Sequence, residues 1–139
     1  MTQKEENICA LLARSHIRNT QPRRMILAAL GTVARPLSPA EIEVQLGCKV
    51  DLVTIYRTLA LFEKNHLVHK HPSTGGYLLC TIPERSGHHG FLTCTSCKTT
   101  EEFHDPRFCK LEEAIAHRAK FSAMEHVSEI LGLCSHCRL

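Results

Sequence analysis

Two Cys-x-x-Cys pairs are the residues of this sequence whose types and spacing best fit a chemical role. The first pair is Cys94 and Cys97, and the second is Cys134 and Cys137. Each pair can form a tight turn that points two sulfurs at one ion, and four thiolates in a tetrahedron are a typical ligand set for structural Zn²⁺. The gap between the pairs exceeds that of a compact zinc ribbon, so the intervening segment must fold on its own. We therefore predict a structural zinc site that joins the ends of this segment, with disulfides or buried free thiols as alternatives.

The composition indicates a reducing compartment and metal beyond one structural site. The 139 residues include 8 cysteines and 10 histidines, and the formal net charge is +3. No stretch is long and apolar enough to span a bilayer, and the polar N-terminus resembles neither a signal peptide nor a transit peptide. Cysteines without a secretion signal favour a cytoplasmic protein in which thiols bind metal. The mild positive charge permits nucleic-acid binding without requiring it.

Short helices followed by a β-hairpin are expected in the first half of the chain. Capping residues and apolar spacing predict helices over residues 8–16, 20–31 and 38–47, and a longer one from Asp51. Strands at 67–71 and 77–81 flank a turn rich in glycine. This order is typical of a winged helix-turn-helix, in which the helix from Asp51 enters the major groove and the hairpin is the wing. That helix carries Thr54, Arg57 and Lys64 on its outer side, with Tyr56 at the border. A common small fold with a solvated polar face is the alternative.

The second half is predicted to be a small α+β domain. Residues 82–87 have the composition of a hinge, so we divide the chain into a DNA-binding domain (1–81), a hinge (82–87) and a dimerisation and metal-binding domain (88–139). Strands are expected at 91–94, 99–103 and 121–133, and a helix from Pro106 with Phe108, Leu111 and Ile115 inside. Because so small a domain buries little core, zinc and dimerisation are both expected to stabilise it.

A second group of metal ligands follows from the hairpin. If residues 73–76 form its loop, His71 faces Leu78 and His69 faces Cys80, and opposed residues share one face of the sheet. A thiolate and an imidazole at that distance suit one shared metal ion. His88, His89, Glu101 and Glu102 follow the hinge and the first Cys-x-x-Cys pair. We therefore predict a His/Cys/His/Glu metal site with ligands from both halves of the chain. The alternative is that these histidines are ordinary surface residues.

Over nearly its whole length the chain resembles the ferric-uptake-regulator (Fur) family. The residues that carry the resemblance are Thr20-Gln21-Pro22-Arg23-Arg24, Val53-Thr54-Ile55-Tyr56-Arg57-Thr58-Leu59, His88-His89 and the two Cys-x-x-Cys pairs. Within the family it is most similar to the zinc-uptake-regulator branch (Zur), through residues 68–80 and Gly132-Leu133-Cys134. Two positions differ from the iron branch, which usually has a third histidine and an aspartate near His89, where this chain has Gly90 and Phe91. Lys98 also stands where a glycine commonly follows the first pair.

The resemblance implies a homodimeric repressor that binds double-stranded operator DNA when zinc is bound, with about two zinc ions per chain and no small organic substrate. It implies structural zinc on the four cysteines, and regulatory zinc on His69, Cys80, His88 and Glu102, with His89 as the alternative to His88. Tyr56 and Arg57 would face DNA, and Arg23, Arg24, Thr54 and Lys64 are further candidate contacts. His126, with Cys109 as its possible partner, marks a third family site.

Three other classes of function were weighed against this reading. An iron- or peroxide-responsive regulator of the same family is one alternative, although Gly90 and Phe91 weaken iron sensing. A zinc deaminase needs His-x-Glu before Pro-Cys-x-x-Cys, a pattern that precedes neither Cys94 nor Cys134, so no enzyme is expected. A zinc-containing scaffold without DNA binding is the third alternative.

Overall fold

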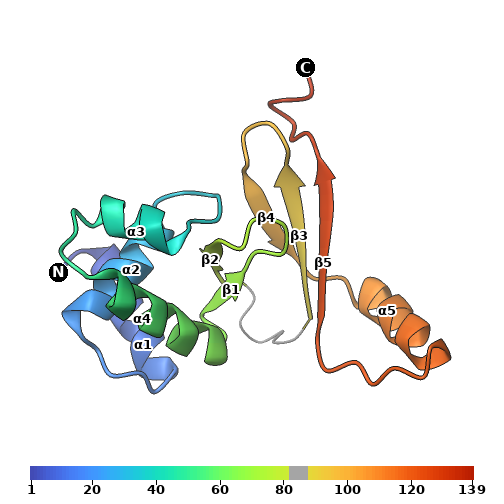
Figure 1. The fold of residues 1–139 in the computed structure, drawn as a ribbon, viewed down its shortest axis with the longest axis horizontal. Helices are drawn as coiled ribbons and strands as arrows, with labels where there is room; N and C mark the ends of the chain where they lie inside the picture. The colour runs from blue at the N-terminus through green and yellow to red at the C-terminus, as the bar shows by residue number, and fades with distance from the viewer. Residues whose placement is uncertain (82–87) are drawn as a thin grey trace. The chain divides into compact units, whose positions relative to one another are not determined.

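The computed structural model describes residues 1–81 and 88–139, without the side chain of His88. The chain divides into two compact units, Met1–Cys80 and Thr81–Leu139, which are described separately (Figure 1). The hinge predicted at residues 82–87 lies outside the described residues. None of the described helices is long and apolar enough to cross a membrane.

The first unit is a winged helix-turn-helix, as predicted. Its elements are α1 (Gln3–Arg14), α2 (Gln21–Leu30), α3 (Pro39–Gln45), α4 (Leu52–Lys64), β1 (Val68–Lys70) and β2 (Tyr77–Leu79). Helix α1 is longer than the predicted 8–16, because Thr2 and Glu5 form a capping box that starts it earlier. The wing gains a further contact from Leu37, whose backbone forms a bridge with Tyr77.

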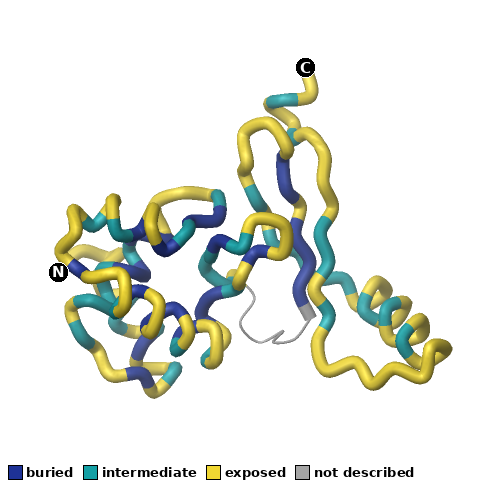
Figure 2. The backbone as a smooth tube through the Cα atoms, viewed as in Figure 1, coloured by how far each residue is buried: buried dark blue, intermediate teal, exposed yellow. Residues whose placement is uncertain are grey.

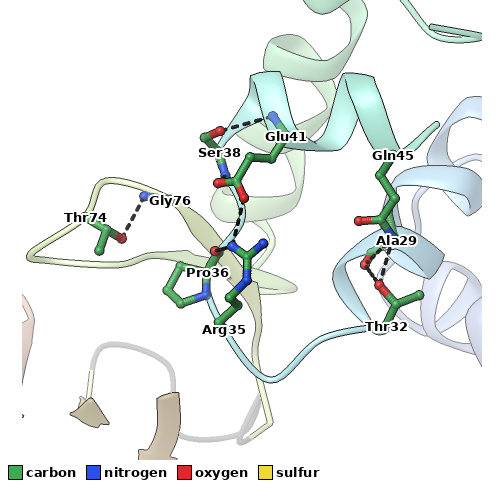
Figure 3. Close-up of polar contacts among 9 residues, drawn as sticks. All are labelled: Ala29, Thr32, Arg35, Pro36, Ser38, Glu41, Gln45, Thr74 and Gly76. Atoms are coloured by element: carbon green, nitrogen blue, oxygen red, sulfur yellow. Dashed lines mark hydrogen bonds and ion pairs between the residues drawn. The ribbon is translucent and has the colours of Figure 1, made fainter. Parts of the chain in front are cut away.

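Side-chain caps fix the N-terminal ends of α3 and α4, the two helices of the helix-turn-helix. Ser38 accepts the backbone N–H of Glu41, and the Glu41 carboxylate in turn accepts the backbone N–H of Ser38 (Figure 3). The same carboxylate lies 2.8 Å from the guanidinium of Arg35, which lowers the pKa of Glu41. Asp51 caps α4 through a 2.8 Å bond from the backbone N–H of Thr54. These caps satisfy N–H groups that a helix start leaves without intrahelical partners.

A continuous hydrophobic core supports this unit. Its largest fully buried side chains include Leu12 of α1, Ile26 of α2, Ile42 of α3 and Phe62 of α4. The wing contributes Val68, which is also fully buried. Each helix therefore places its apolar side in one shared core, and this leaves the outer side of α4 exposed.

The register of the wing differs from the prediction. His69 pairs with Leu78, not with Cys80. The turn is closed one residue earlier than assumed, by His71, whose N–H donates to the carbonyl of Gly76 at 2.7 Å. Pro72 has no N–H to donate and cannot take that closing position. Thr74 stabilises the turn, because its hydroxyl accepts the backbone N–H of Gly76 (Figure 3).

The second unit is a three-stranded sheet with one helix. Its elements are β3 (His88–Cys94), β4 (Thr100–Phe103), α5 (Pro106–Arg118) and β5 (His126–Gly132). The strand order is β4-β3-β5, with β3 antiparallel to β4 and parallel to β5. Strand β5 starts later than the predicted residue 121. The α+β prediction for this half is confirmed.

Helix α5 does not bury the residues predicted to be inside. Phe108, Leu111 and Ile115 are 37%, 55% and 50% exposed, and Figure 2 shows α5 exposed or intermediate along its length. The apolar stripe of this helix is real, but a three-stranded sheet is too small to cover it. Within the sheet, the Phe103 ring of β4 packs directly over Gly90 of β3, where an added Cβ would lie 2.3 Å from the ring.

Candidate metal centres

The four cysteines of the two Cys-x-x-Cys pairs form one cluster in the second unit. Their Sγ atoms all lie within 4.8 Å of one another, and Cys97 and Cys134 are 3.8 Å apart. Four sulfurs at about 2.3 Å from Zn²⁺ would be about 3.8 Å apart in a tetrahedron. The parallel pairing of β3 and β5 sets Cys94 opposite Gly132, and so brings the second pair beside the first. The donor set and its spacing therefore fit a closed, structural zinc site.

Backbone groups around this cluster stabilise thiolate. The Cys94 sulfur accepts the backbone N–H groups of Cys134 at 3.4 Å and Cys97 at 3.5 Å, which lowers the pKa of Cys94 to about 6. The hydroxyl of Thr99 lowers the pKa of Cys97. By contrast, the neighbouring Cys134 raises the pKa of Cys137 to about 12. Neighbouring negative charges disfavour one another, and a divalent cation supplies the positive charge that four thiolates need.

Within the first unit, His69 and Cys80 form a pair that we call the wing pair. A ring nitrogen of His69 and the Cys80 sulfur lie within 4.8 Å. Cys80 donates its backbone N–H to the carbonyl of Leu67, so it continues the β1–β2 ladder beyond Leu79 and lies diagonally from His69. Diagonal neighbours share a face of the sheet and remain within reach of each other. The two predicted ligands thus lie close together as expected, although the register that brings them together is different.

Within the second unit, His89 and Glu102 form a second pair, the strand pair. His89 Nδ1 lies 2.6 Å from Glu102 Oε1, and both residues are largely or fully shielded from solvent in their side chains. The Oε2 atom of Glu102 accepts the backbone N–H of Thr81 at 2.8 Å and the hydroxyl of Thr81 at 3.0 Å. His88 is the first residue of β3, and its side chain lies outside the described residues. The described geometry therefore pairs Glu102 with His89, the alternative named from the sequence.

His126 has a different set of partners. Its Nδ1 lies 2.9 Å from Glu112 and its Nε2 lies 3.7 Å from Glu113, and Ser128 donates its hydroxyl to Glu112. Among the described residues, no group of three ligand atoms close enough for one ion includes His126 or Cys109. These contacts attach α5 to β5, and a metal site at His126 stays a prediction.

Helix α4 presents the residues predicted to face DNA. Arg57 and Lys64 are exposed, and Tyr56 is 54% exposed. Thr54 is partly buried, and its hydroxyl donates to Asp51 at 2.9 Å. Thr54 is thus part of the cap that starts α4, whereas the other three project from the outer side of the helix.

Arg23 and Arg24 support the segment that precedes α2. The guanidinium of Arg23 donates to the backbone carbonyl of Arg18 at 2.8 Å. Arg24 donates to the side chain of Asn19. Both arginines are intermediate in exposure, so they hold this loop while leaving positive charge near the surface.

Sequence reasoning did not select Thr81, which contacts Glu102 through two bonds. Nothing in the residues near Thr81 signals this contact, because the two residues are 21 positions apart in the chain. Only the chain path from β2 to β4 brings them together.

Comparisons with known proteins agree with this architecture. The Ferric uptake regulator family matches residues 14–131. The ferric uptake regulation protein of Neisseria meningitidis (serogroup B) is 30% identical over 136 residues, which cover 95% of this chain and 94% of that protein. The solved structure of holo XcZur superposes with a TM-score of 0.84 at 25% identity, covering 95% of this chain and 96% of that one. A zinc uptake regulator complexed with zinc and DNA has a TM-score of 0.85 at 22% identity, covering 98% and 95%, which shows a shared fold. The chain therefore belongs to the ferric uptake regulator family, a family of metal-responsive transcription regulators and not of enzymes.

Proposed function

We propose that this protein is a zinc-responsive transcriptional repressor that acts as a dimer in the cytoplasm. In this proposal Cys94, Cys97, Cys134 and Cys137 hold a structural zinc ion. The wing pair and the strand pair together bind a second, regulatory zinc ion. The protein then binds operator DNA in its zinc-loaded form and represses genes for zinc uptake.

The observation that carries the proposal is that each unit contains a preassembled half of a ligand set. His69 and Cys80 are adjacent within the first unit, and His89 and Glu102 are in contact within the second. Two ligands bind a metal ion weakly, whereas four complete a tetrahedral site. When bound, zinc would supply a positive charge that attracts the ligand atoms of both pairs. Full affinity therefore requires that the two units approach each other.

This requirement gives a physical route from metal to DNA. The two pairs favour the arrangement of units in which all four ligands meet, and that arrangement presents the α4 helices of a dimer to successive turns of the major groove. DNA favours the same arrangement. By linkage, zinc raises the affinity for DNA by the same factor as DNA raises the affinity for zinc.

Two features favour zinc as the sensed metal. A thiolate such as Cys80 is a soft ligand that suits Zn²⁺ better than Fe²⁺. The chain also has Gly90 and Phe91 near His89, at the positions where the iron branch that it resembles usually has a histidine and an aspartate. The Phe103 ring occupies the space beside Gly90. This packing requires glycine at position 90, because any side chain there would collide with the ring.

The proposed DNA surface is the outer side of α4. Arg57 and Tyr56 are exposed near the start of that helix, and Lys64 is exposed at its end. A guanidinium can bind a phosphate or a base edge, and the two roles differ in their salt and sequence dependence. Arg23 and Arg24 are assigned a supporting role, since their guanidinium groups already bond to Arg18 and Asn19.

Dimerisation is proposed to occur through the second unit. Its α5 leaves Phe108, Leu111 and Ile115 exposed, and β5 is an edge strand with Val127, Ile130 and Leu131 exposed. An unpaired edge beside apolar side chains is costly in water. A second copy of the same surface would cover both features with two-fold symmetry.

The test is operator binding across a series of buffered free zinc concentrations. Wild-type protein should gain about tenfold or more in DNA affinity on adding zinc, a coupling of about 1.4 kcal/mol or more. Cys80→Ser should lose this gain but keep its fold, its dimer and the zinc ion of the cysteine cluster. Cys48→Ser, at an exposed cysteine of the same unit, is the matched control. If Cys80→Ser keeps an unaltered zinc dependence, the wing pair is not a sensor.

The names of the curated relatives favour a second candidate, an iron-responsive regulator. The same DNA assay with Fe²⁺ under reducing conditions separates the two. A rise in affinity with iron at metal concentrations where zinc has no effect would assign the protein to iron.

A further inference from the structure

Thr81 contacts the carboxylate of Glu102 with two donors at once. Its backbone N–H and its hydroxyl both donate to Oε2, at 2.8 and 3.0 Å. The other oxygen, Oε1, lies 2.6 Å from Nδ1 of His89. The two oxygens of this carboxylate therefore have different surroundings, and its orientation is fixed at both ends.

A glutamate without such support is a poorly oriented ligand. Its side chain has several rotatable bonds, and holding it in one geometry costs conformational entropy. Its carboxylate can also bind a metal through one oxygen or through both. Two donors on Oε2 remove this freedom before any metal binds, and they leave Oε1 as the atom directed to His89. Groups that orient a ligand in this way are known to change metal affinity by about 10- to 100-fold.

We propose that Thr81 is a positioning residue of the regulatory metal site, which holds Glu102 so that Oε1 is its ligand atom. This inference rests on the proposed sensing role of Glu102 and adds a residue to it. Thr81 also directly follows the proposed ligand Cys80 in the chain. Thr81 is therefore next in sequence to one proposed ligand, Cys80, and hydrogen-bonded to another, Glu102.

The two donors can be separated by mutation. Thr81→Val removes the hydroxyl and keeps the β-branched shape and the backbone N–H, whereas Thr81→Ser keeps both donors. Thr93→Val is the matched control, because Thr93 is a buried threonine of the same unit whose hydroxyl donates to another glutamate, Glu129, at 2.9 Å. It removes a similar bond away from Glu102.

The experiment measures the affinity of the weaker of the two zinc sites by competition with a fluorescent chelator, using full-length protein. Thr81→Val should bind this zinc about tenfold more weakly, and Thr81→Ser and Thr93→Val should stay within about twofold of the wild type. With Co²⁺ as the probe, Thr81→Val should shift the absorption bands of the regulatory site, and Thr81→Ser should restore them. In the metal-free protein, hydrogen exchange at the Thr81 amide should be slow in the wild type and fast in Glu102→Ala.

Three outcomes overturn the inference in different ways. Wild-type affinity in Thr81→Val, with a clear loss in Glu102→Ala, removes Thr81 from the site and leaves the proposed function intact. Equal losses in Thr81→Val and Thr93→Val, in step with the melting temperature of the metal-free protein, assign Thr81 a structural role only. An unchanged second zinc site in both Glu102→Ala and Cys80→Ser overturns the proposed function itself.

Discussion

The two units of this protein reach stability by different means. The first unit has a core that draws large apolar side chains from all four helices and from the wing. In the second unit, Phe91 and Cys94 are the hydrophobic residues that are buried among those described, and α5 has no buried residue. The first unit is therefore expected to fold on its own hydrophobic free energy, whereas the second is expected to need a metal ion and a partner.

The largest effect should come from opening the cysteine cluster. Cys94→Ser should lose one zinc ion per chain, the dimer and the cooperative unfolding of the second unit, because zinc bound by thiolates contributes on the order of 10 kcal/mol to small domains. The helical core of the first unit should remain. Metal content, sedimentation and calorimetry measure these changes, with Cys48→Ser as the control. A folded, dimeric Cys94→Ser protein would show that the cluster is not structural.

The reverse experiment removes core from the first unit. Phe62→Ala truncates a fully buried ring and should lower the free energy of unfolding of this unit by about 3–5 kcal/mol. Zinc in the cysteine cluster and the dimer should be unaffected. Circular dichroism reports the helices, and metal analysis reports the cluster. Loss of the clustered zinc in Phe62→Ala would mean that the two units do not fold independently.

A smaller effect is expected at the contact between Gly90 and Phe103. In Gly90→Ala the new Cβ meets the Phe103 ring at 2.3 Å, so the second unit should lose about 1–3 kcal/mol from overpacking. Phe103→Leu alone should cost stability by leaving space, but it should reduce the cost of Gly90→Ala in the double variant. Additive effects in this cycle would show that the ring does not limit position 90.

The smallest effect concerns Lys98, which has a positive φ of 67° directly after the first Cys-x-x-Cys pair. Glycine adopts this conformation without the steric cost that other residues carry. Lys98→Gly should therefore stabilise the zinc-loaded second unit by about 1 kcal/mol or less. Lys98→Ala keeps the Cβ but removes the bond from the Lys98 ammonium to the carbonyl of Thr95, and it should not stabilise. A thermal melt of both variants compares the two effects.

Local patterns predicted much of this structure. Ser38, Asp51 and Pro106 each mark a helix start that the structure has, because capping is decided by a few neighbouring residues. The clustering of the four cysteines was also predicted from local sequence, since Cys-x-x-Cys spacing favours a turn that points both sulfurs at one ion. His69 and Cys80 lie close together as predicted, and their role as metal ligands stays a prediction.

Features that depend on longer-range geometry were predicted less well. The wing register was wrong by two positions, because the closing pair of the turn depends on which residue can donate its N–H beside Pro72. The stripe on α5 was identified, but periodicity does not tell what covers a stripe. The choice between His88 and His89 stays a prediction, because the side chain of His88 lies outside the described residues. The bonds between Thr81 and Glu102 depend on the path of the chain between them.

The parallel pairing of β3 with β5 also affects the order in which the two units fold. The paired residues are far apart in sequence, as Cys94 and Gly132 show, while helices form from near neighbours. Structures with distant pairings fold more slowly than helical ones. During synthesis the DNA-binding unit is thus expected to fold while the metal-dependent unit is still incomplete. A newly made chain would then lack its complete cysteine cluster until β5 is in place, so the time needed to assemble this unit follows from strand order as well as from metal supply.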